Sequence, residues 1–532
     1  MSRPVSTLFL ATVVALAACS PENSELLAPA IGPVLAASAA NKTPSSVSLV
    51  KIGGFANGGV GASEIPAYDE VSKRIFVVNG ALGSVDVYDA QNPTAPMFVE
   101  RFTFSGGANS VAASKGVVAV AVQAADGVSN GTVHFYRATT LEKVSVVTVG
   151  ALPDMLTFSA SGRTVVVANE GEPNRDYSID PVGSVSIIDV SNINKPTVRQ
   201  VGFDAFNGQA AALRASGVRI YGPNATVAQD FEPEYVTISD DESKAWVSLQ
   251  ENNALAVIDL ASATVSQILP LGFKNHSLAG NGLDVSDRDN AINIRTWPVF
   301  GMYQPDAIGH YTANGQTYIV TANEGDARDY IGFAEEARVS TLSLNTSIFT
   351  SAICGGTCNA ASRLGRLTVT NTLGRNPVTG LYDALYVLGA RSFSIWTASG
   401  TLVYDSGDQL EQLTKNLSMV NFNASNTGNT ADDRSDNKGP EPEGLVIAKF
   451  GEKTMAFIGL ERVGGVAVYD ITNPTAPIYQ SYINTRTGAT GDLGPEGITF
   501  VPANRSPNKE PLIIVGNEVS GTTAIFQVKL NY

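Results

Sequence analysis

The chain has 532 residues, of which 44% are hydrophobic and 16% charged, and it contains 50 glycines. This length exceeds one simple core and predicts either two or three domains or one large repeat architecture rich in turns. The formal net charge of −15, from 35 basic and 50 acidic residues, excludes a basic face for nucleic acid or anionic lipid, so we predict no nucleic-acid partner.

The N-terminus has the pattern of an export signal. Residues 1–18 contain one early positive charge and then an apolar run that is shorter than a membrane span. The sequence Leu16-Ala17-Ala18-Cys19 resembles a bacterial lipobox, in which the cysteine is lipidated after cleavage; a plain secretory signal with a chance cysteine is the alternative. Residues 19–47 are rich in Ser, Ala and Pro and predict a flexible, lipid-anchored tether. We therefore expect a protein exported to the bacterial cell envelope, at the outer membrane or cell surface, that contacts the membrane only through this anchor.

From residue 48 to residue 532 the chain repeats one pattern. Each unit has a short strand led by an acid or amide, a second apolar strand with a polar tip, and a third strand. The lead residues are Glu64, Asn109, Asp154, Glu234, Asp306, Glu443 and Glu496, and a weaker start near Arg366 lacks the acid. The likeness of VYDAQNPTAP (87–96) to VYDITNPTAP (468–477) supports the repeat. Repeats of this size indicate a solenoid, a propeller or an array.

Short strands at even spacing with Gly, Asn and Pro turns predict an all-β fold, a single large β-propeller. Eight starts suggest eight blades, with seven as the alternative because residues 345–380 are ambiguous. We expect residues 48–55 to pair as the outer strand of the blade built from 496–530, which would close the ring and remove free sheet edges. Long insertions at 204–231, 270–304 and 405–440 are candidates for function.

The lead residues predict a ring of acids around the channel, because the first strand of each propeller blade faces the axis. The second-strand tips add further carboxylates, at Glu170, Glu251, Glu324, Glu461 and Glu518. Two carboxylates ~6 Å apart at an effective dielectric of ~20 repel by roughly 3 kcal/mol. Some must therefore be protonated, paired with arginine, or neutralised by bound cations.

Two motifs show this chemistry twice. VVVANEGEPNRDY (165–177) and IVTANEGDARDY (319–330) each end a strand in Asn-Glu-Gly and continue to Arg-Asp-Tyr. An arginine next to such a tip offers a planar fork that pairs two carboxylate oxygens. A purely structural lattice of arginines and carboxylates is thus one interpretation of the repeat, and a divalent metal is the other.

Acidic insertions favour the metal. Residues 283–294 and 429–444 gather carboxylates and amides on irregular loops, and calcium takes six to eight such oxygens; solvated loops with Asx turns are the alternative. We predict calcium, or another divalent metal. The predicted ligands are Glu64, Asp154, Glu234, Asp306, Glu324, Glu443 and Glu496 in the ring, and Asp284, Asp287, Asp289, Asp433 and Asp436 in the loops.

Candidate catalytic groups are positive or titratable residues near these acids. Arg328, Arg391 and Arg462 would neutralise a phosphate, while Lys438 and His276 would protonate a leaving group. A lone histidine is more often simply hydrogen-bonded. The sequence shows no nucleophile elbow, Ser-His-Asp set, phosphate loop or dinucleotide fingerprint. Cys354 and Cys358 in CGGTC predict a small disulfide loop, given the exported location.

The longest motifs resemble one family. GNGLDVSDRDNAINIRTWPVFGMYQPDAI, TANEGDARDY, DDRSDNKGPEPEGL and GLERVGGVAVYDIT look like the choice-of-anchor I family of exported bacterial proteins, over about residues 48–530. The resemblance implies a propeller-like body on the cell surface, and some relatives are labelled alkaline phosphatase. It implies no established set of catalytic residues.

Two hypotheses follow. The first is a metal-dependent phosphoesterase, similar in kind to calcium-dependent propeller phytases, that acts on a phosphorylated small molecule. The second is a non-catalytic binding or adhesion propeller that holds structural metal and a surface ligand. In both we expect a monomer.

Overall fold

The computed structural model describes residues 42–417 and 421–532. The predicted signal peptide at 1–18, the lipidation site Cys19 and the tether as far as residue 41 lie outside the described residues. Residues Thr43–Tyr532 form one unit. Its first strand, β1 (Ser46–Ala56), begins two residues before the predicted start of the propeller at residue 48.

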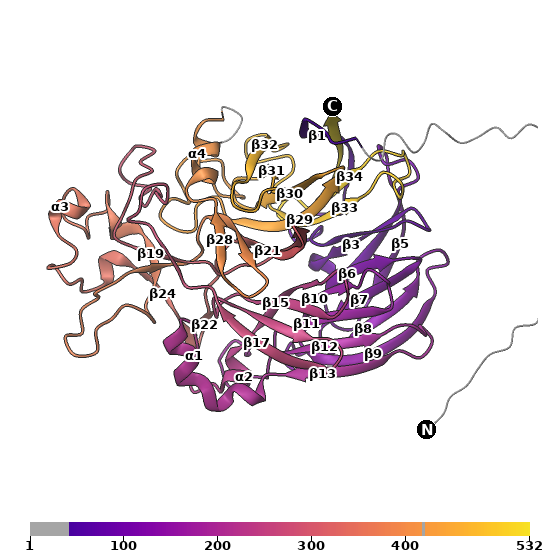
Figure 1. The fold of residues 1–532 in the computed structure, drawn as a ribbon, viewed down its shortest axis with the longest axis horizontal. Coiled ribbons are helices and arrows are strands. Elements are labelled where there is room, and N and C mark those ends of the chain that lie inside the picture. The colour runs from indigo at the N-terminus through magenta and orange to yellow at the C-terminus, as the bar shows by residue number, and fades with distance from the viewer. Residues whose placement is uncertain (1–41, 418–420) are drawn as a thin grey trace, which may run out of the picture. The chain divides into compact units, whose positions relative to one another are not determined.

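Seven four-stranded antiparallel sheets make up the body of this unit (Figure 1). The first strand of each blade contacts the first strands of the two neighbouring blades, and the last contacts the first, so these strands form a closed inner ring. They are β2 (Pro66–Asp69), β6 (Ala108–Ser114), β10 (Pro153–Phe158), β14 (Pro233–Ile238), β20 (Ile308–Ala313), β29 (Pro442–Phe450) and β33 (Pro495–Val501). The all-β propeller that we predicted is therefore confirmed.

The remaining strands of each blade follow outward in order. The second strands are β3 (Arg74–Asn79), β7 (Val117–Val122), β11 (Thr164–Asn169), β15 (Lys244–Leu249), β21 (Gln316–Asn323), β30 (Lys453–Leu460) and β34 (Leu512–Asn517). The third are β4 (Ser84–Asp89), β8 (Asn130–Arg137), β12 (Ser184–Asp189), β16 (Ala254–Asp259), β27 (Ser392–Thr397), β31 (Val466–Asp470) and β35 (Thr522–Asn531). The outer strands are β5 (Met97–Thr103), β9 (Lys143–Ala151), β13 (Thr197–Gly202), β17 (Thr264–Pro270), β28 (Leu402–Asp405), β32 (Ile478–Ile483) and β1.

Second strands form the core because they are apolar on both faces. In β7, Val118, Ala119, Val120 and Ala121 are completely buried, as expected for a strand covered by the neighbouring blade on each side. One face of β7 packs in a cluster with the first blade and the other in a cluster with the third. Packing of neighbouring blades thus buries apolar side chains on both faces of each second strand, which a single sheet would leave exposed.

The blade number is seven, the alternative that we considered, and not eight. The weak start near Arg366 forms η4 (Leu364–Arg366) and β25 (Thr368–Thr370), which pairs only with β24 (Glu336–Arg338). These elements belong to an insertion between β21 and β27, the second and third strands of one blade. The same insertion contains the hairpin β22 (Asp329–Tyr330) and β23 (Phe333–Ala334).

A further small sheet lies in these insertions. It consists of β18 (Phe273–Asn275), β19 (Phe300–Met302) and β26 (Tyr386–Val387). Its strands are two or three residues long, too short to form a blade of their own. Cys354 and Cys358 of the same region are joined in a disulfide.

The ring closes through the two ends of the unit. β1 pairs antiparallel with β35 from Ser46 opposite Asn531 to Ala56 opposite Thr522. The closing blade therefore combines three C-terminal strands with one N-terminal strand, as we predicted. The pairing of β1 with β35 thus holds the N-terminal strand and the C-terminal strand in one sheet.

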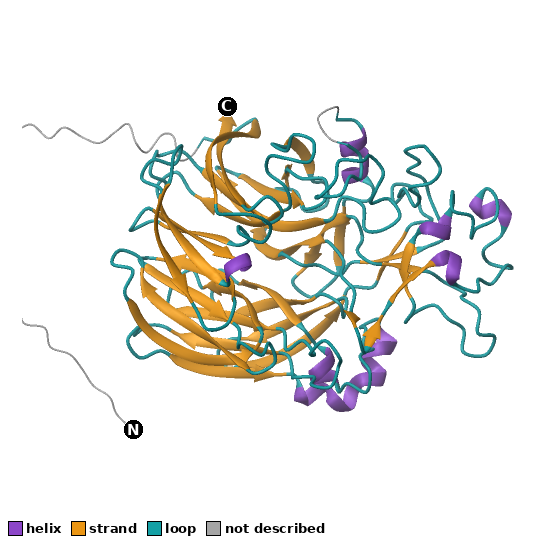
Figure 2. Cartoon of the chain, turned by 180° about the vertical axis from the view of Figure 1, so that it is seen from behind, coloured by secondary structure: helices purple, strands orange, loops and turns teal. Residues whose placement is uncertain are grey.

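The helices of the described residues are short, and all except η1, which lies in the turn between β3 and β4, are in the insertions. They are η1 (Gly80–Leu82), η2 (Asp204–Gln209), α1 (Ala210–Ser216), α2 (Val227–Asp230), η3 (Val339–Thr341), α3 (Ser351–Cys354), η4 and α4 (Gln409–Lys415). Figure 2 shows the strands of the blades gathered on one side and most helices and long loops on the other. Among residues 42–417 and 421–532, no helix has the length and hydropathy that crossing a membrane requires.

Candidate functional site

The inner strands are irregular at their lead residues. In five of them the pairing register shifts around the lead residue, which is Asn109, Asp154, Glu234, Glu443 or Glu496. A bulge of this kind takes a residue out of the hydrogen-bonded ladder and redirects its side chain. The repeat thus contains a bulge that directs the lead side chain toward the axis.

These side chains meet at one end of the channel. Six of the seven lead residues line a cavity of about 240 Å³, together with Glu324 and Asp326. The six are Asn109, Asp154, Glu234, Asp306, Glu443 and Glu496. The seventh, Glu64, lies close enough to this group for its charge to act on Glu496. The structure therefore brings the predicted ring together in one place, which we call the acidic mouth.

Two carboxylate triads lie within the acidic mouth. Oxygens of Asp154, Glu170 and Glu234 are all within 4.8 Å of one another, as are those of Asp306, Glu324 and Glu443. In each triad one blade supplies its lead acid and its second-strand tip, and the next blade supplies its lead acid. The tips, Glu170 and Glu324, are the glutamates of the two Asn-Glu-Gly motifs, so each copy of the motif completes one triad.

Most of these carboxylates lack a hydrogen-bond donor. Among the described residues, the side chains of Asp154, Glu170 and Glu234 have no hydrogen bond or ion pair within the distances that define one. The Oε2 atoms of Glu443 and Glu496 are buried and also unpartnered. Buried anionic oxygens without donors or counter-ions are unfavourable, so this mouth is incomplete as a purely structural element.

The electrostatics of the mouth reflect this shortage of donors. Burial is the largest cause and, with the charges of neighbouring acids, raises the pKa of Glu64 to about 8 and the pKa of Asp154 to about 7. The same two causes hold the pKa of Glu234, Asp306 and Glu443 well above the usual range. Without a bound cation, the ring therefore keeps part of its protons near neutral pH.

Two further acids, Glu172 and Asp326, lie close to the triads. Glu172 and Asp326 occupy equivalent places, two residues after the triad glutamate in each repeated motif. The Tyr330 hydroxyl donates to Glu172 Oε1 at 2.8 Å, and the rings of Tyr177 and Tyr330, the tyrosines that end the two motifs, pack edge to face. The two motifs thus contact each other next to the mouth.

Arg328 and Arg391, which we predicted to bind phosphate, do not reach the cavity. Arg328 is buried and pairs with Asp230 at 2.6 Å and Glu232 at 2.9 Å. Arg391 is buried and pairs with Glu411 at 2.5 Å, and it also donates to the carbonyl of Asp284. Because both guanidiniums are already paired with buried carboxylates, the structural interpretation of the arginines fits both of them.

Arg462 and Lys438 lie closer to the mouth. Arg462 pairs with Glu441 and Glu461, each at 3.0 Å. The Lys438 ammonium lies 3.0 Å from Glu324 Oε1 and 3.2 Å from Glu441 Oε2. Burial lowers the pKa of Lys438, but the charges of these glutamates outweigh it and hold the pKa well above the usual range. Such a group is a poor proton donor near neutral pH.

His276 is also outside the cavity. It is 1% exposed, and its Nδ1 is 2.7 Å from the Asn281 carbonyl, while its Nε2 is buried without a partner. Burial and then the charge of Lys274 lower the pKa of His276 well below its usual value. The histidine is therefore neutral and enclosed, which is the hydrogen-bonded alternative that we weighed.

The acidic loops form a separate cluster rather than part of the mouth. Arg366 joins Asp287 at 2.9 Å to Asp436 at 2.7 Å. Asp284 accepts backbone N–H groups from Ser286 and Asn293. The other two predicted ligands are Asp289, which accepts the backbone N–H of Ala291, and Asp433, which is exposed. None of the five predicted loop ligands lines the cavity, and arginines or backbone donors satisfy most of them.

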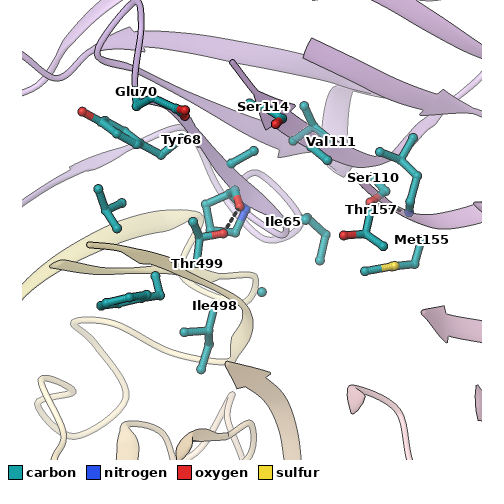
Figure 3. Close-up of a pocket in the computed structure, with 18 of the residues that line it drawn as sticks. Ile65, Tyr68, Glu70, Ser110, Val111, Ser114, Met155, Thr157, Ile498 and Thr499 are labelled. Atoms are coloured by element: carbon teal, nitrogen blue, oxygen red, sulfur yellow. Dashed lines mark hydrogen bonds between the residues drawn. The ribbon is translucent and has the colours of Figure 1, made fainter. Parts of the chain in front are cut away.

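The opposite end of the channel has different chemistry. A second cavity of about 260 Å³ shares Ile65, Ser110 and Met155 with the acidic mouth. Figure 3 shows apolar and hydroxyl side chains around it, and the Thr499 hydroxyl donates to the Pro66 carbonyl at 2.5 Å. Its acid, Glu70, lies 3.8 Å from Arg505. The excess negative charge is thus confined to one end.

Some site residues escaped the sequence prediction. The sequence indicates Glu170 as a strand tip but not as a ligand, and Glu441 only as one of the acids in the loop 429–444; it does not single out Glu172 or Asp326. Two signals mark them in the sequence. The Asn-Glu-Gly motifs align Glu170 with Glu324 and Glu172 with Asp326, and the Glu-Pro-Glu triplets at 232–234 and 441–443 align Glu441 with Glu232.

Comparison with known proteins assigns the family. The model of the choice-of-anchor I domain matches residues 64–474, which include the inner strands of six blades and both triads. The chain belongs to the choice-of-anchor I family. Membership of this family indicates an exported cell-surface β-propeller.

Two curated relatives are similar in sequence to this choice-of-anchor I protein. Gigasin-3a from Magallana gigas is 33% identical over 186 residues, 31% of this chain and 65% of the relative. The mesenchyme-specific cell surface glycoprotein of Strongylocentrotus purpuratus is 28% identical over 327 residues, 53% of this chain and 42% of the relative. The chain thus spans less than two thirds of the length of either relative.

Among solved structures, hydrazine synthase of Kuenenia stuttgartiensis aligns with 89% of this chain and 98% of its own, with a TM-score of 0.47 and 12% identity. The assignment of the fold depends on the seven sheets and their closed inner ring.

Proposed function

We propose that this choice-of-anchor I protein is a cation-binding propeller of the cell surface, and that a divalent cation, calcium first, binds in the acidic mouth. The observation behind the proposal is the triad of Asp154, Glu170 and Glu234, whose oxygens lie within 4.8 Å of one another. No donor from the described residues satisfies them. A cation among them would remove the repulsion and supply the missing partner.

Calcium suits this donor set better than softer or smaller metals. All candidate ligands are carboxylate or amide oxygens, and neither cysteine nor histidine lines the cavity. Hard cations prefer such ligands, and calcium accepts six to eight of them in irregular geometry, whereas magnesium requires a near-ideal octahedron. The unpartnered Oε2 atoms of Glu443 and Glu496 fit the same interpretation.

The cation would act first on the fold. Each triad joins two neighbouring blades, so a bound ion would tie one blade to the next. Open coordination positions toward the cavity would let a surface ligand with anionic oxygens bind the same ion. The name of the sea-urchin relative, a cell surface glycoprotein, is consistent with such a role at a surface.

Calcium binding by the mature chain tests this proposal directly. Titration calorimetry should give saturable binding, and a chelator should lower the melting temperature. Asp154→Asn should weaken binding at least tenfold, because it removes one anionic oxygen from the triad. Asp433→Asn is the matched control, since this exposed acid lies away from the cavity, and it should leave binding unchanged. Absence of saturable binding by the unmodified chain would contradict the proposal.

Hydrolysis of phosphoesters is the second candidate. One observation favours it: both triads adjoin one cavity, and paired cations there could hold a phosphate and activate a water. Because Arg328 and Arg391 are paired with carboxylates and do not line the cavity, the cations themselves would have to neutralise the phosphate. Assays of a chromogenic phosphomonoester and a phosphodiester, with calcium and with chelator, test this candidate. If neither substrate is hydrolysed with any divalent ion, the phosphoesterase function is excluded.

The anchor is a separate proposal. Cys19 would be the lipidated first residue of the mature chain, followed by the tether. Mass spectrometry of the N-terminal peptide should show an added diacylglycerol, and Cys19→Ala should release the protein from the membrane fraction. An unmodified Cys19 in membrane-bound protein would contradict lipid anchoring.

A further inference from the structure

The two triads are built from equivalent parts. Residues 229–235, QDFEPEY, and 438–444, KGPEPEG, align so that Glu234 matches Glu443 and Glu232 matches Glu441. Both segments run into inner strands, β14 and β29, and both have the same register shift after the proline. The alignment pairs Gln229 with Lys438 and Asp230 with Gly439, and these are the two positions at which the copies differ in charge.

Lys438 already places a cation at the second triad. Its side chain is 10% exposed, and its ammonium lies 3.0 Å from Glu324 Oε1 and donates to the Gly325 carbonyl. The other oxygen of Glu324 accepts from Gln250 Nε2 at 2.9 Å. Both oxygens of the central glutamate of this triad are therefore satisfied by the protein itself.

The first triad has no such group. Gln229 points elsewhere: its Oε1 accepts from Thr226 and its Nε2 donates to the Asp180 carbonyl, within the capping box of α2. The buried guanidinium of Arg328 is paired with Asp230 and Glu232. Among the described residues, no lysine or arginine contacts Asp154, Glu170 or Glu234.

A second observation points to a missing cation near the first triad. Glu251 is 6% exposed, and its Oε2 is buried with no hydrogen-bond partner. Its carboxylate lies close enough to Glu170 and Glu234 for its charge to act on both. This part of the mouth thus holds a fourth, almost fully buried carboxylate, and Arg328, whose charge acts on it, is already paired with Asp230 and Glu232.

We infer that Lys438 is a built-in counter-ion that occupies the second triad, and that the exchangeable divalent cation binds at the first triad of Asp154, Glu170 and Glu234. The inference depends on the proposed cation binding and makes it more specific. A second divalent ion would share Glu324 with the ammonium, and repulsion between the two cations opposes its binding. A third group, Glu324, Glu441 and Glu461, is likewise paired with Lys438 and Arg462. The wild-type chain therefore binds one calcium ion tightly, at the first triad.

Calcium stoichiometry, measured by equilibrium dialysis and metal analysis of the mature chain, tests the inference. We expect one tightly bound ion in the wild type, two in Lys438→Met, and one again in Lys438→Arg, which restores the charge. Asp154→Asn should lose the wild-type ion. Lys453→Met is the matched control, because Lys453 pairs with Asp470 away from the mouth; it should keep one ion.

The outcomes separate the inference from the proposed function. No bound calcium in the folded wild type contradicts the proposed function itself. Two ions in the wild type, or one ion in Lys438→Met, overturns the inference and leaves cation binding in place. Retention of the ion by Asp154→Asn also overturns it, because the ion would then lie elsewhere. If Lys438→Met does not fold, Lys438→Gln, which keeps a donor to Glu324, gives the same comparison.

Discussion

At the scale of single residues, the arginines of the two repeated motifs make different contacts. Arg328 pairs with Asp230 and Glu232 and lies over the ring of Tyr221. Its counterpart Arg175, at the same place in the first copy, has no ion pair within 4.0 Å among the described residues. A sequence motif therefore predicts the position of an arginine in the repeat, but not the carboxylate with which it pairs.

Arg328→Ala should destabilise the chain strongly. It leaves two buried carboxylates without their cation, which typically costs ~3–5 kcal/mol. The loss should appear in chemical denaturation with calcium and with chelator alike, because Arg328 does not line the mouth. Arg505→Ala is the control: this half-exposed arginine is 3.8 Å from Glu70, and such pairs contribute about 0–1 kcal/mol. Unchanged stability in Arg328→Ala would show that the pairing is not structural.

The position of the acidic residues in the candidate site could be predicted from the sequence. Lead acids recur at fixed places in a repeat, and a propeller turns equivalent positions toward one axis, so Asp154, Glu234, Asp306, Glu443 and Glu496 could be placed together. The roles of Arg328 and His276 could not be predicted. The partners of Arg328 lie 98 and 96 residues away in the sequence, and no local pattern reports such a contact.

At the scale of elements, β1 determines whether the ring closes. Gly53 lies at the register shift of β1, where the strand approaches the loop of the first blade. A Cβ atom at Gly53 would lie 2.3 Å from the Pro93 carbonyl oxygen and 2.8 Å from Thr94 Cα, both backbone atoms. The closing strand therefore requires glycine at this position.

Gly53→Val should weaken the closure. Overpacking of this kind costs ~1–3 kcal/mol, and we expect faster hydrogen exchange in β1 and β35 as well as a lower melting temperature. Gly59→Ala is the control, because a Cβ there meets nothing within 4 Å. Protection of β35 that equals the wild type in a folded Gly53→Val protein would show that closure does not depend on this contact.

The number of blades was harder to predict than their type. The strand pattern of a blade recurs strongly wherever acid, turn and apolar run follow one another. Between β21 and β27, however, the chain inserts elements such as β26, whose short apolar run looks like a blade strand. Short apolar runs alone do not distinguish a strand of the main sheet from one in an insertion. Only the pairing partners show that β26 joins β18 and β19.

At the scale of the whole molecule, stability should depend on pH in an unusual direction. The pKa of Glu64 is raised to about 8 and that of Glu251 to about 8, chiefly by burial. A carboxyl with a raised pKa binds more protons when the chain is folded. Its contribution is complete below the pKa of the unfolded chain, roughly 4.3, and is lost as the pH rises through the raised pKa.

Without calcium, we therefore expect the melting temperature to fall as the pH rises from about 5 to about 8.5. Saturating calcium should flatten this slope, because the cation replaces the protons in the mouth. Glu64→Gln should reduce the slope in the calcium-free protein, since glutamine does not titrate. Scanning calorimetry across this range checks the sign, and a melting temperature that rises with pH in the calcium-free chain would contradict it.

The location of the cation is the most direct test of the whole account. Crystals of the mature chain soaked in calcium, measured at a wavelength where calcium scatters anomalously, should show one strong peak between Asp154, Glu170 and Glu234, with Lys438 still seated on Glu324. A mouth free of anomalous density in crystals that hold calcium elsewhere would contradict the claim that this ring of carboxylates is a cation site.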